Sequence, residues 1–171
     1  VNIESIGATA EVIGVIAILV SLVYLAAQIR QSNAIATAEA EREVLQNWMH
    51  GLEGLVDSDQ TTELFLNGLR DFESLSAIEK TRLSYRLTEL NMVYISALEN
   101  EKKGLVAPHL VEAFGNVFLA YVLSPGGRRW WDLHRTFFTN TDLIDQRITS
   151  DGTEIPSILD SLPYHRVEHS K

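Results

Sequence analysis

The chain has 171 residues, a formal net charge of −9 and no cysteine. The acidic excess opposes attraction to phosphate backbones, so we expect no nucleic-acid partner. Without cysteine the chain can form no disulfide, thiolate metal site or cysteine nucleophile. The length suits one compact domain beside a membrane segment.

The first predicted element is an apolar helix. Residues 12–27 contain no charged side chain, and Glu11 and Arg30 stand on either side of them. A bilayer core of about 30 Å requires roughly 20 helical residues, which residues 8–27 supply. We therefore expect residues 1–30 to form a membrane anchor. The alternative is the buried core helix of a soluble domain.

Small side chains recur along one face of this helix at alternating steps of three and four. This small-residue ladder consists of Gly7, Ala10, Gly14, Ala17 and Ser21. Lipid gives helices no hydrophobic drive to associate, so close contact over small side chains is a main source of packing in a bilayer. We expect the ladder to contact a second copy of the chain or a different membrane subunit. The alternative is a single anchor whose glycine and alanine content is ordinary for membrane helices.

The flanks of the apolar segment predict its orientation. No lysine or arginine precedes it, whereas Arg30 and Arg42 follow it. The positive-inside bias then places the N-terminus outside and residues 31–171 in the cytoplasm, and the lack of a basic flank before the segment argues against a cleaved signal. Glu11 is the one acid at the edge of the apolar zone. It either lies among the headgroups or, deeper in the membrane, requires a hydrogen-bonded partner.

Helical periodicity continues after the anchor, which we expect to run on to about residue 54 or 57. A short helix is expected over residues 60–69, with Asp59 as its N-cap and Gly68 at its end.

Three further helices have clear boundaries in the sequence. Ser76 and Glu79 form an S-x-x-E capping box for a helix that closes at Gly104. Pro108 suits the first turn of a helix that extends to residue 123. Ser124 and the proline after it begin a helix that reaches about residue 138.

A last short helix is expected over residues 141–147, and residues 149–171 read as an irregular tail. Together the patterns predict an all-α protein. Its N-terminal transmembrane helix continues into a cytoplasmic antiparallel bundle of about four to five helices, over residues 31–148.

The most distinctive cytoplasmic segment is SPGGRRWWDLHRTFF, residues 124–138. Its candidate residues for an anion or an interface are Gly126, Gly127, Arg128, Arg129, Trp130, Trp131 and His134. Trp130, His134, Phe137 and Phe138 share one helical face. We favour a protein core rimmed by arginines over docking at the membrane interface. In a third interpretation, free N–H groups at the two glycines bind an anion, although no Walker or dinucleotide pattern accompanies them.

Signatures of catalysis are absent from the sequence, including G-x-S-x-G, H-E-x-x-H, the E-x-x-H of di-iron bundles and the calcium loop. The nearest approach to a ligand set is Glu39, Glu43 and His50 on one helix with His109 and Glu112 on another. Solvated polar faces explain these residues better than a metal does. We therefore expect no catalytic residue, no metal and no cofactor.

Three stretches carry a resemblance to a known family. They are AEVIGVIAILVSLVYLAAQIRQSN at residues 10–33, FLNGL at residues 65–69 and SPGGRRWW at residues 124–131. With these motifs the chain resembles a widespread family of small bacterial membrane proteins with no assigned activity, over roughly residues 5–145. The resemblance implies a bacterial inner-membrane setting and supplies no substrate, cofactor or catalytic residue. The tail from residue 149 lies outside the family pattern.

We expect a non-catalytic membrane-anchored subunit or scaffold that associates with itself or with other proteins. Its expected partners are membrane lipid and a helix packed against the small-residue ladder. The alternative function is a membrane-bound sensor or enzyme that binds an anionic ligand near residues 128–134.

Overall fold

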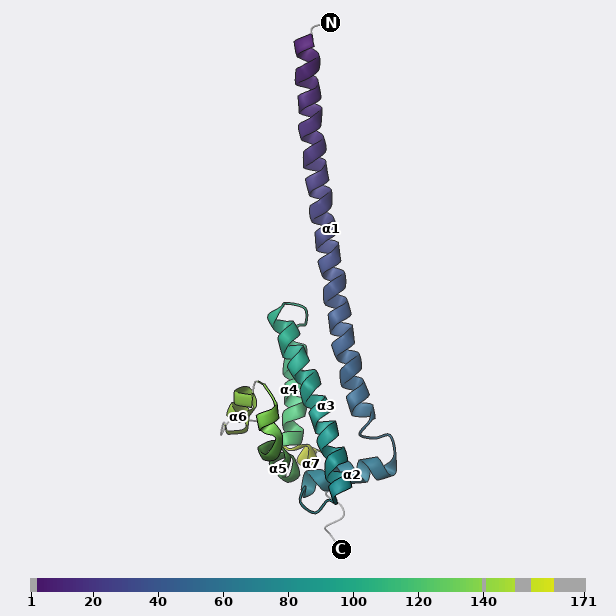
Figure 1. The fold of residues 1–171 in the computed structure, drawn as a ribbon, viewed down its shortest axis with the longest axis vertical. Coiled ribbons are helices and arrows are strands. Elements are labelled where there is room, and N and C mark those ends of the chain that lie inside the picture. The colour runs from purple at the N-terminus through teal and green to yellow at the C-terminus, as the bar shows by residue number, and fades with distance from the viewer. Residues whose placement is uncertain (1–2, 140, 150–154, 162–171) are drawn as a thin grey trace. The chain divides into compact units, whose positions relative to one another are not determined.

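The computed structural model describes residues 3–139, 141–149 and 155–161, with side chains from residue 11 onward (Figure 1). Within these ranges every regular element is a helix, which confirms the predicted all-α class. The chain divides into two compact units, Val1–Glu39 and Ala40–Lys171. The helices are α1 (Ile3–Glu53), α2 (Asp59–Arg70), α3 (Ala77–Lys102), α4 (Pro108–Val122), α5 (Pro125–His134), the 3-10 helix η1 (Arg135–Phe137), α6 (Thr141–Thr149) and α7 (Ile158–Ser161).

The first unit contains the apolar part of α1. The large apolar side chains between residues 12 and 29 are each 51 to 71% exposed. A core helix of a soluble domain would have these side chains buried, but no described residue covers them. One helix of the described chain is thus long and apolar enough to cross a membrane.

The boundaries of α2 differ from the prediction. Its N-cap is Ser58 rather than Asp59, because the Ser58 Oγ accepts the N–H of Thr61 at 3.2 Å. Gly68 does not end the helix, which continues to Arg70. A Cβ at Gly68 would lie 2.4 Å from Leu83 Cδ2, so this glycine permits close packing of α2 on α3.

Both predicted signals of α3 are confirmed. The Ser76 Oγ accepts the Glu79 N–H at 3.4 Å, and Glu79 Oε2 accepts the Ser76 N–H at 2.8 Å. After the C-cap, Gly104 has φ +71°, a backbone angle that residues with a side chain rarely adopt. Pro108 stands in the first turn of α4 and Pro125 in that of α5, as predicted.

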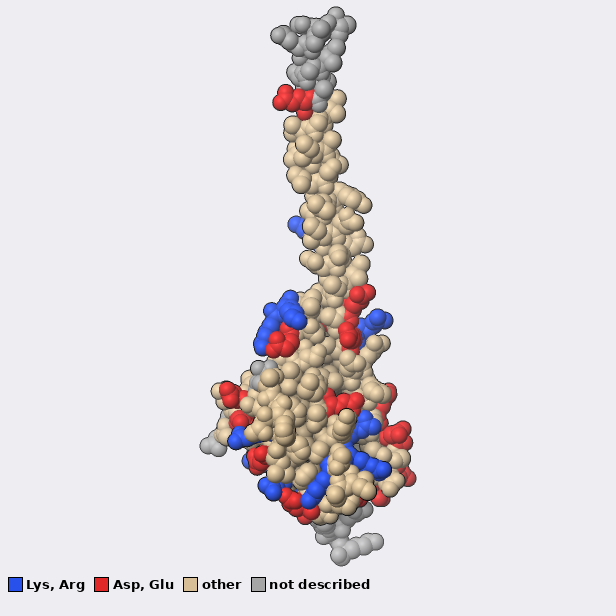
Figure 2. Space-filling view, viewed as in Figure 1, with Lys and Arg blue, Asp and Glu red and all other residues tan. Residues whose placement is uncertain are grey.

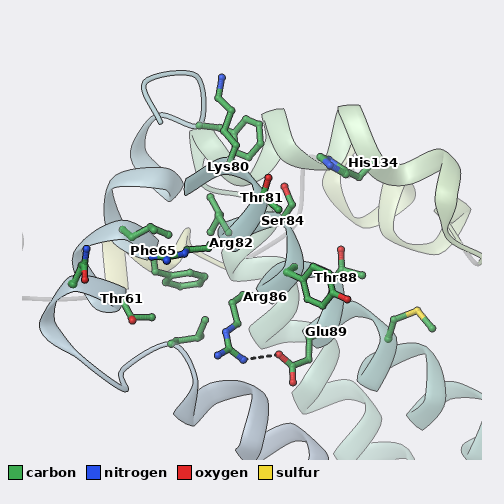
Figure 3. Close-up of a pocket in the computed structure, with 17 residues that line it drawn as sticks. Thr61, Phe65, Lys80, Thr81, Arg82, Ser84, Arg86, Thr88, Glu89 and His134 are labelled. Carbon is green, nitrogen blue, oxygen red and sulfur yellow. Dashed lines mark hydrogen bonds and ion pairs between the residues drawn. The ribbon is translucent and has the colours of Figure 1, made fainter. Parts of the chain in front are cut away.

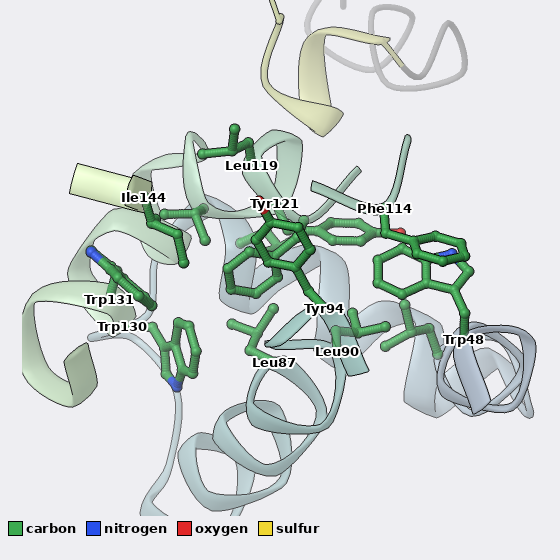
Figure 4. Packing of buried hydrophobic residues seen from close by; sticks show 14 of the residues in the cluster. Trp48, Leu87, Leu90, Tyr94, Phe114, Leu119, Tyr121, Trp130, Trp131 and Ile144 are labelled. Atoms are coloured by element: carbon green, nitrogen blue, oxygen red, sulfur yellow. The ribbon is translucent and has the colours of Figure 1, made fainter. Parts of the chain in front are cut away.

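The core of the second unit is built mainly between α3 and α4. Buried side chains of α3 face the buried stripe of α4, and aromatic pairs lie at both ends (Figure 4). At one end Trp48 of α1 contacts Phe114 with ring centroids 4.7 Å apart. At the other end Phe118 meets Trp130 and Trp131 of α5. This continuous apolar core holds the helices of the unit together.

The segment predicted to be an irregular tail contains α7, a single helical turn. Ile155, Ile158 and Leu159 are partly buried against the core, so residues 155–161 belong to the folded unit. The predicted fifth helix also ends earlier than expected. It gives way at Arg135 to η1 rather than continuing to residue 138.

Acid is expected to weaken this unit through Glu79 and Glu73. The pKa of Glu79 is lowered by its hydrogen bonds with Ser76, and that of Glu73 by its bonds with Lys80 and then Arg129. A carboxyl group whose pKa is lower in the folded state than its ordinary value of 4.5 stabilises the fold at a pH above 4.5. This stabilisation is lost as the pH falls through the pKa of the folded state.

The Glu79→Gln and Glu73→Gln variants should therefore melt below the wild type at pH 7, with the gap closing towards pH 3. Thermal unfolding followed by circular dichroism in mild detergent measures this. The control is Glu112→Gln on the exposed surface of α4. A gap that stays constant between the two pH values would contradict the expectation.

Candidate functional site

The first candidate surface is the small-residue ladder on α1. Gly14, Ala17 and Ser21 are exposed, and a Cβ built at Gly14 meets nothing within 4 Å. The Ser21 hydroxyl donates to the Ala17 carbonyl at 2.8 Å, so the polar group of this face is satisfied within the helix. The side chains of Gly7 and Ala10 lie outside the described residues. Contact between this ladder and another helix stays a prediction.

Charge is distributed unevenly over the surface. Figure 2 shows a long tan surface on the apolar part of α1, whereas acidic and basic groups are interspersed over the helices of the second unit. Glu11 is exposed at the start of the tan segment. A helix with no charge over this length and apolar groups on every side suits a lipid environment.

The second candidate is the tryptophan segment of α5, which the structure places in the core. Trp130 is 0% and Trp131 is 2% exposed, so neither side chain is available to a membrane interface. Trp131 Nε1 donates to Asp145 Oδ1 of α6 at 2.8 Å. The predicted aromatic face is only partly correct, because Phe137 is 80% exposed and Trp131, absent from that face, is buried.

The two glycines at the start of α5 serve contact between helices. A Cβ at Gly126 would lie 1.8 Å from the carbonyl oxygen of Gly68, and one at Gly127 would lie 2.1 Å from that of Tyr121. The Gly127 N–H donates to the Ser124 Oγ at 3.0 Å. This N–H group is therefore engaged by the N-cap, which takes away one of the donors that an anion would need.

The polar residues of this segment are partly engaged as well. Arg129 forms a salt bridge with Glu73, and the His134 ring bonds the Trp130 carbonyl through Nδ1 at 2.8 Å. Arg128 is exposed. Arg129 and His134 thus bond different neighbours, and no described contact joins either of them to Arg128, so the geometry gives no support to anion binding at residues 128–134.

A third surface was not predicted from the sequence. A groove of about 1230 Å³ lies along α3 between α2 and the α1–α2 connection (Figure 3). We call it the α2–α3 groove, and its lining includes Leu55, Thr61, Leu64, Phe65, Phe72, Lys80, Thr81, Arg82, Leu83, Ser84, Tyr85, Arg86, Thr88, Glu89, Met92 and His134. A signal for it existed in the sequence. Ile78, Tyr85 and Met92 recur at steps of seven on the face of α3 opposite the core stripe, where polar residues are the rule.

Charged groups edge this groove. Lys80 bonds Glu73 at 2.8 Å, and Arg86 bonds Glu89 at 2.9 Å (Figure 3 shows the latter pair). The Lys80 ammonium also lies 5.6 Å from the centroid of the Phe72 ring. Arg86 covers Gly54, where a Cβ would lie 2.4 Å from a guanidinium nitrogen.

Within the described residues no three histidine or acidic side chains lie close enough to hold a metal ion. Comparison with protein-family models, curated proteins and solved structures finds no match. The resemblance to the bacterial membrane family therefore stays a prediction.

Proposed function

We propose that the protein is a non-catalytic, membrane-anchored subunit or scaffold of a bacterial membrane assembly. In this proposal α1 crosses the inner membrane with its N-terminus outside, and the helical unit after it is cytoplasmic. The small-residue ladder packs against a second copy or another membrane subunit. The helical unit presents a surface to further partners.

The single observation that carries the proposal is the exposed apolar surface of α1. The large apolar side chains between residues 12 and 29 would each leave more than half of their area in water. A contiguous surface of this kind is costly in a soluble protein and favourable in lipid. Basic residues on the C-terminal side alone favour the stated orientation.

The ladder supplies the test of association. Replacing Gly14 by leucine is expected to lower the particle mass of the protein in mild detergent, because the added side chain separates two helix backbones that approach over small residues. The open space around Gly14 means that the substitution disturbs no contact within the chain. Mass is measured by light scattering after size exclusion.

The matched control is Ala26→Leu, which also introduces a leucine but on the opposite face of α1. Both variants should remain in carbonate-washed membranes. A wild-type particle of one chain, with no partner in fixed ratio, would overturn the proposed association, as would equal masses for the two variants. Release of the wild type by carbonate would overturn the membrane anchor.

A further inference from the structure

The dimensions of the α2–α3 groove suit a polypeptide better than a small molecule. Its volume of about 1230 Å³ exceeds the range of about 300 to 1,000 Å³ for small-ligand pockets. Its length follows α3 from Lys80 to Met92, which at the helical rise corresponds to about 18 Å. A helix of three to four turns has this length.

The floor and edge of the groove offer apolar contacts in the pattern that a helix requires. Leu64 of α2 is half-buried in the floor, and the buried side chains of Phe65 and Leu83 lie behind it. Tyr85 is 78% and Met92 is 53% exposed on the edge. Grooves that bind an amphipathic helix combine an apolar floor with apolar anchors about two turns apart.

Charge indicates which helix fits. The lining contains Lys80, Arg82 and Arg86 against the single acid Glu89, in a chain whose net charge is −9. Arg82 forms no salt bridge with a described residue. Two of the three cations are held by acids of this chain, which leaves Arg82 to face a carboxylate of a docked helix.

Three hydroxyl groups of α3 line the groove, and two of them are available to a partner. The Thr81 hydroxyl donates to the Ala77 carbonyl at 2.8 Å, a common hydrogen bond within a helix. Ser84 and Thr88 are half-buried in the groove, and their hydroxyls have no hydrogen-bond partner among the described residues. Their hydroxyls can donate to carboxylates at the edge of a docked helix.

We propose that the α2–α3 groove receives an acidic amphipathic helix of a partner protein, with its apolar face against Leu64, Tyr85 and Met92 and its carboxylates towards Arg82. The inference deepens the proposed function, on which it rests, by naming the partner chemistry of the cytoplasmic unit. Its test measures binding by the detergent-solubilised full chain and does not depend on association through α1, so the two proposals can fail separately.

The probe is a fluorescein-labelled 18-residue helical peptide with leucine at i, i+3, i+4 and i+7 spacing and glutamate on the flanking positions. Binding is followed by fluorescence anisotropy. A second peptide carries lysine in place of every glutamate. We expect the glutamate peptide to bind at least about tenfold more tightly than the lysine peptide, with the difference shrinking at high salt.

Two groove variants and one matched control complete the design. Arg82→Glu and Tyr85→Ala should each weaken binding of the glutamate peptide by about tenfold, and both positions are exposed enough to leave the fold intact. Arg128→Glu makes the same charge reversal on α5, outside the groove, and should leave binding unchanged.

Several outcomes would overturn the inference. They are failure of the glutamate peptide to bind, equal affinity of the two peptides, and equal effects of Arg82→Glu and Arg128→Glu. Displacement of the bound peptide by millimolar inorganic phosphate at constant ionic strength would also overturn it, because this result would assign the groove to a small anion. Loss of the difference between the two peptides when anionic lipid vesicles are added would assign the groove to a membrane surface.

Discussion

Alanine at position 126 is expected to destabilise the helical unit severely. The added Cβ would lie 1.8 Å from the carbonyl oxygen of Gly68, and the second nearest atoms are also backbone. Backbone cannot rotate aside as a flexible side chain can, so α5 must move away from α2 and open the core around Trp130. We expect a loss of about 4 kcal/mol or more, which is a large share of the stability of a domain.

Urea unfolding in mild detergent, followed by tryptophan fluorescence, measures this effect. Gly104→Ala is the matched control, because Gly104 has φ +71° and open space around its Cβ position. Its cost is limited to the backbone conformation, about 1 to 2 kcal/mol. An unfolding midpoint of Gly126→Ala equal to or above that of Gly104→Ala would show that the close approach of α5 to α2 does not matter.

Helix ends were predictable from the sequence where their signals are local. Ser76 with Glu79, Gly104 and the proline at 108 act within one helical turn, so the residues that form each cap are adjacent in the chain. The all-α class follows from the same local patterns and from the period of the apolar residues.

The role of Gly68 shows where local reasoning fails. A glycine near the end of a short apolar period is typical of a helix C-terminus. In the structure its missing Cβ leaves room for the side chains of Leu83 in α3 and of Leu75 just before α3. Both lie beyond the end of α2, so the role of Gly68 depends on the tertiary arrangement. The interpretation of Gly127 as a free donor failed for a local reason, because its N–H donates to the Oγ of the N-cap Ser124 three residues before it.

The candidate surfaces divide in a similar way. The apolar part of α1 could be predicted because one continuous stretch of sequence contains it. The α2–α3 groove could not be located, because residues from the α1–α2 connection, α2 and α3 form it together. Tyr85 and Met92 showed only that α3 carries apolar residues on the side away from its core stripe.

The buried tryptophans provide the second large effect. Alanine in place of Trp130 or Trp131 is expected to cost about 3 to 5 kcal/mol, because each indole is buried and contacts several aromatic rings. Phenylalanine separates packing from hydrogen bonding. Trp131 Nε1 donates to Asp145 at 2.8 Å, whereas Trp130 Nε1 is buried without a partner among the described residues.

Trp131→Phe should therefore destabilise the fold by about 1 to 2 kcal/mol more than Trp130→Phe, since only the first change removes a hydrogen bond to a carboxylate, and the second removes a desolvated donor. A double-mutant cycle with Asp145→Ala, measured by urea unfolding, isolates this term. We expect coupling with Trp131→Phe and additivity with Trp130→Phe. Equal coupling at both positions would mean that the two indoles differ in packing alone, and the bond between α5 and α6 would then contribute nothing to stability.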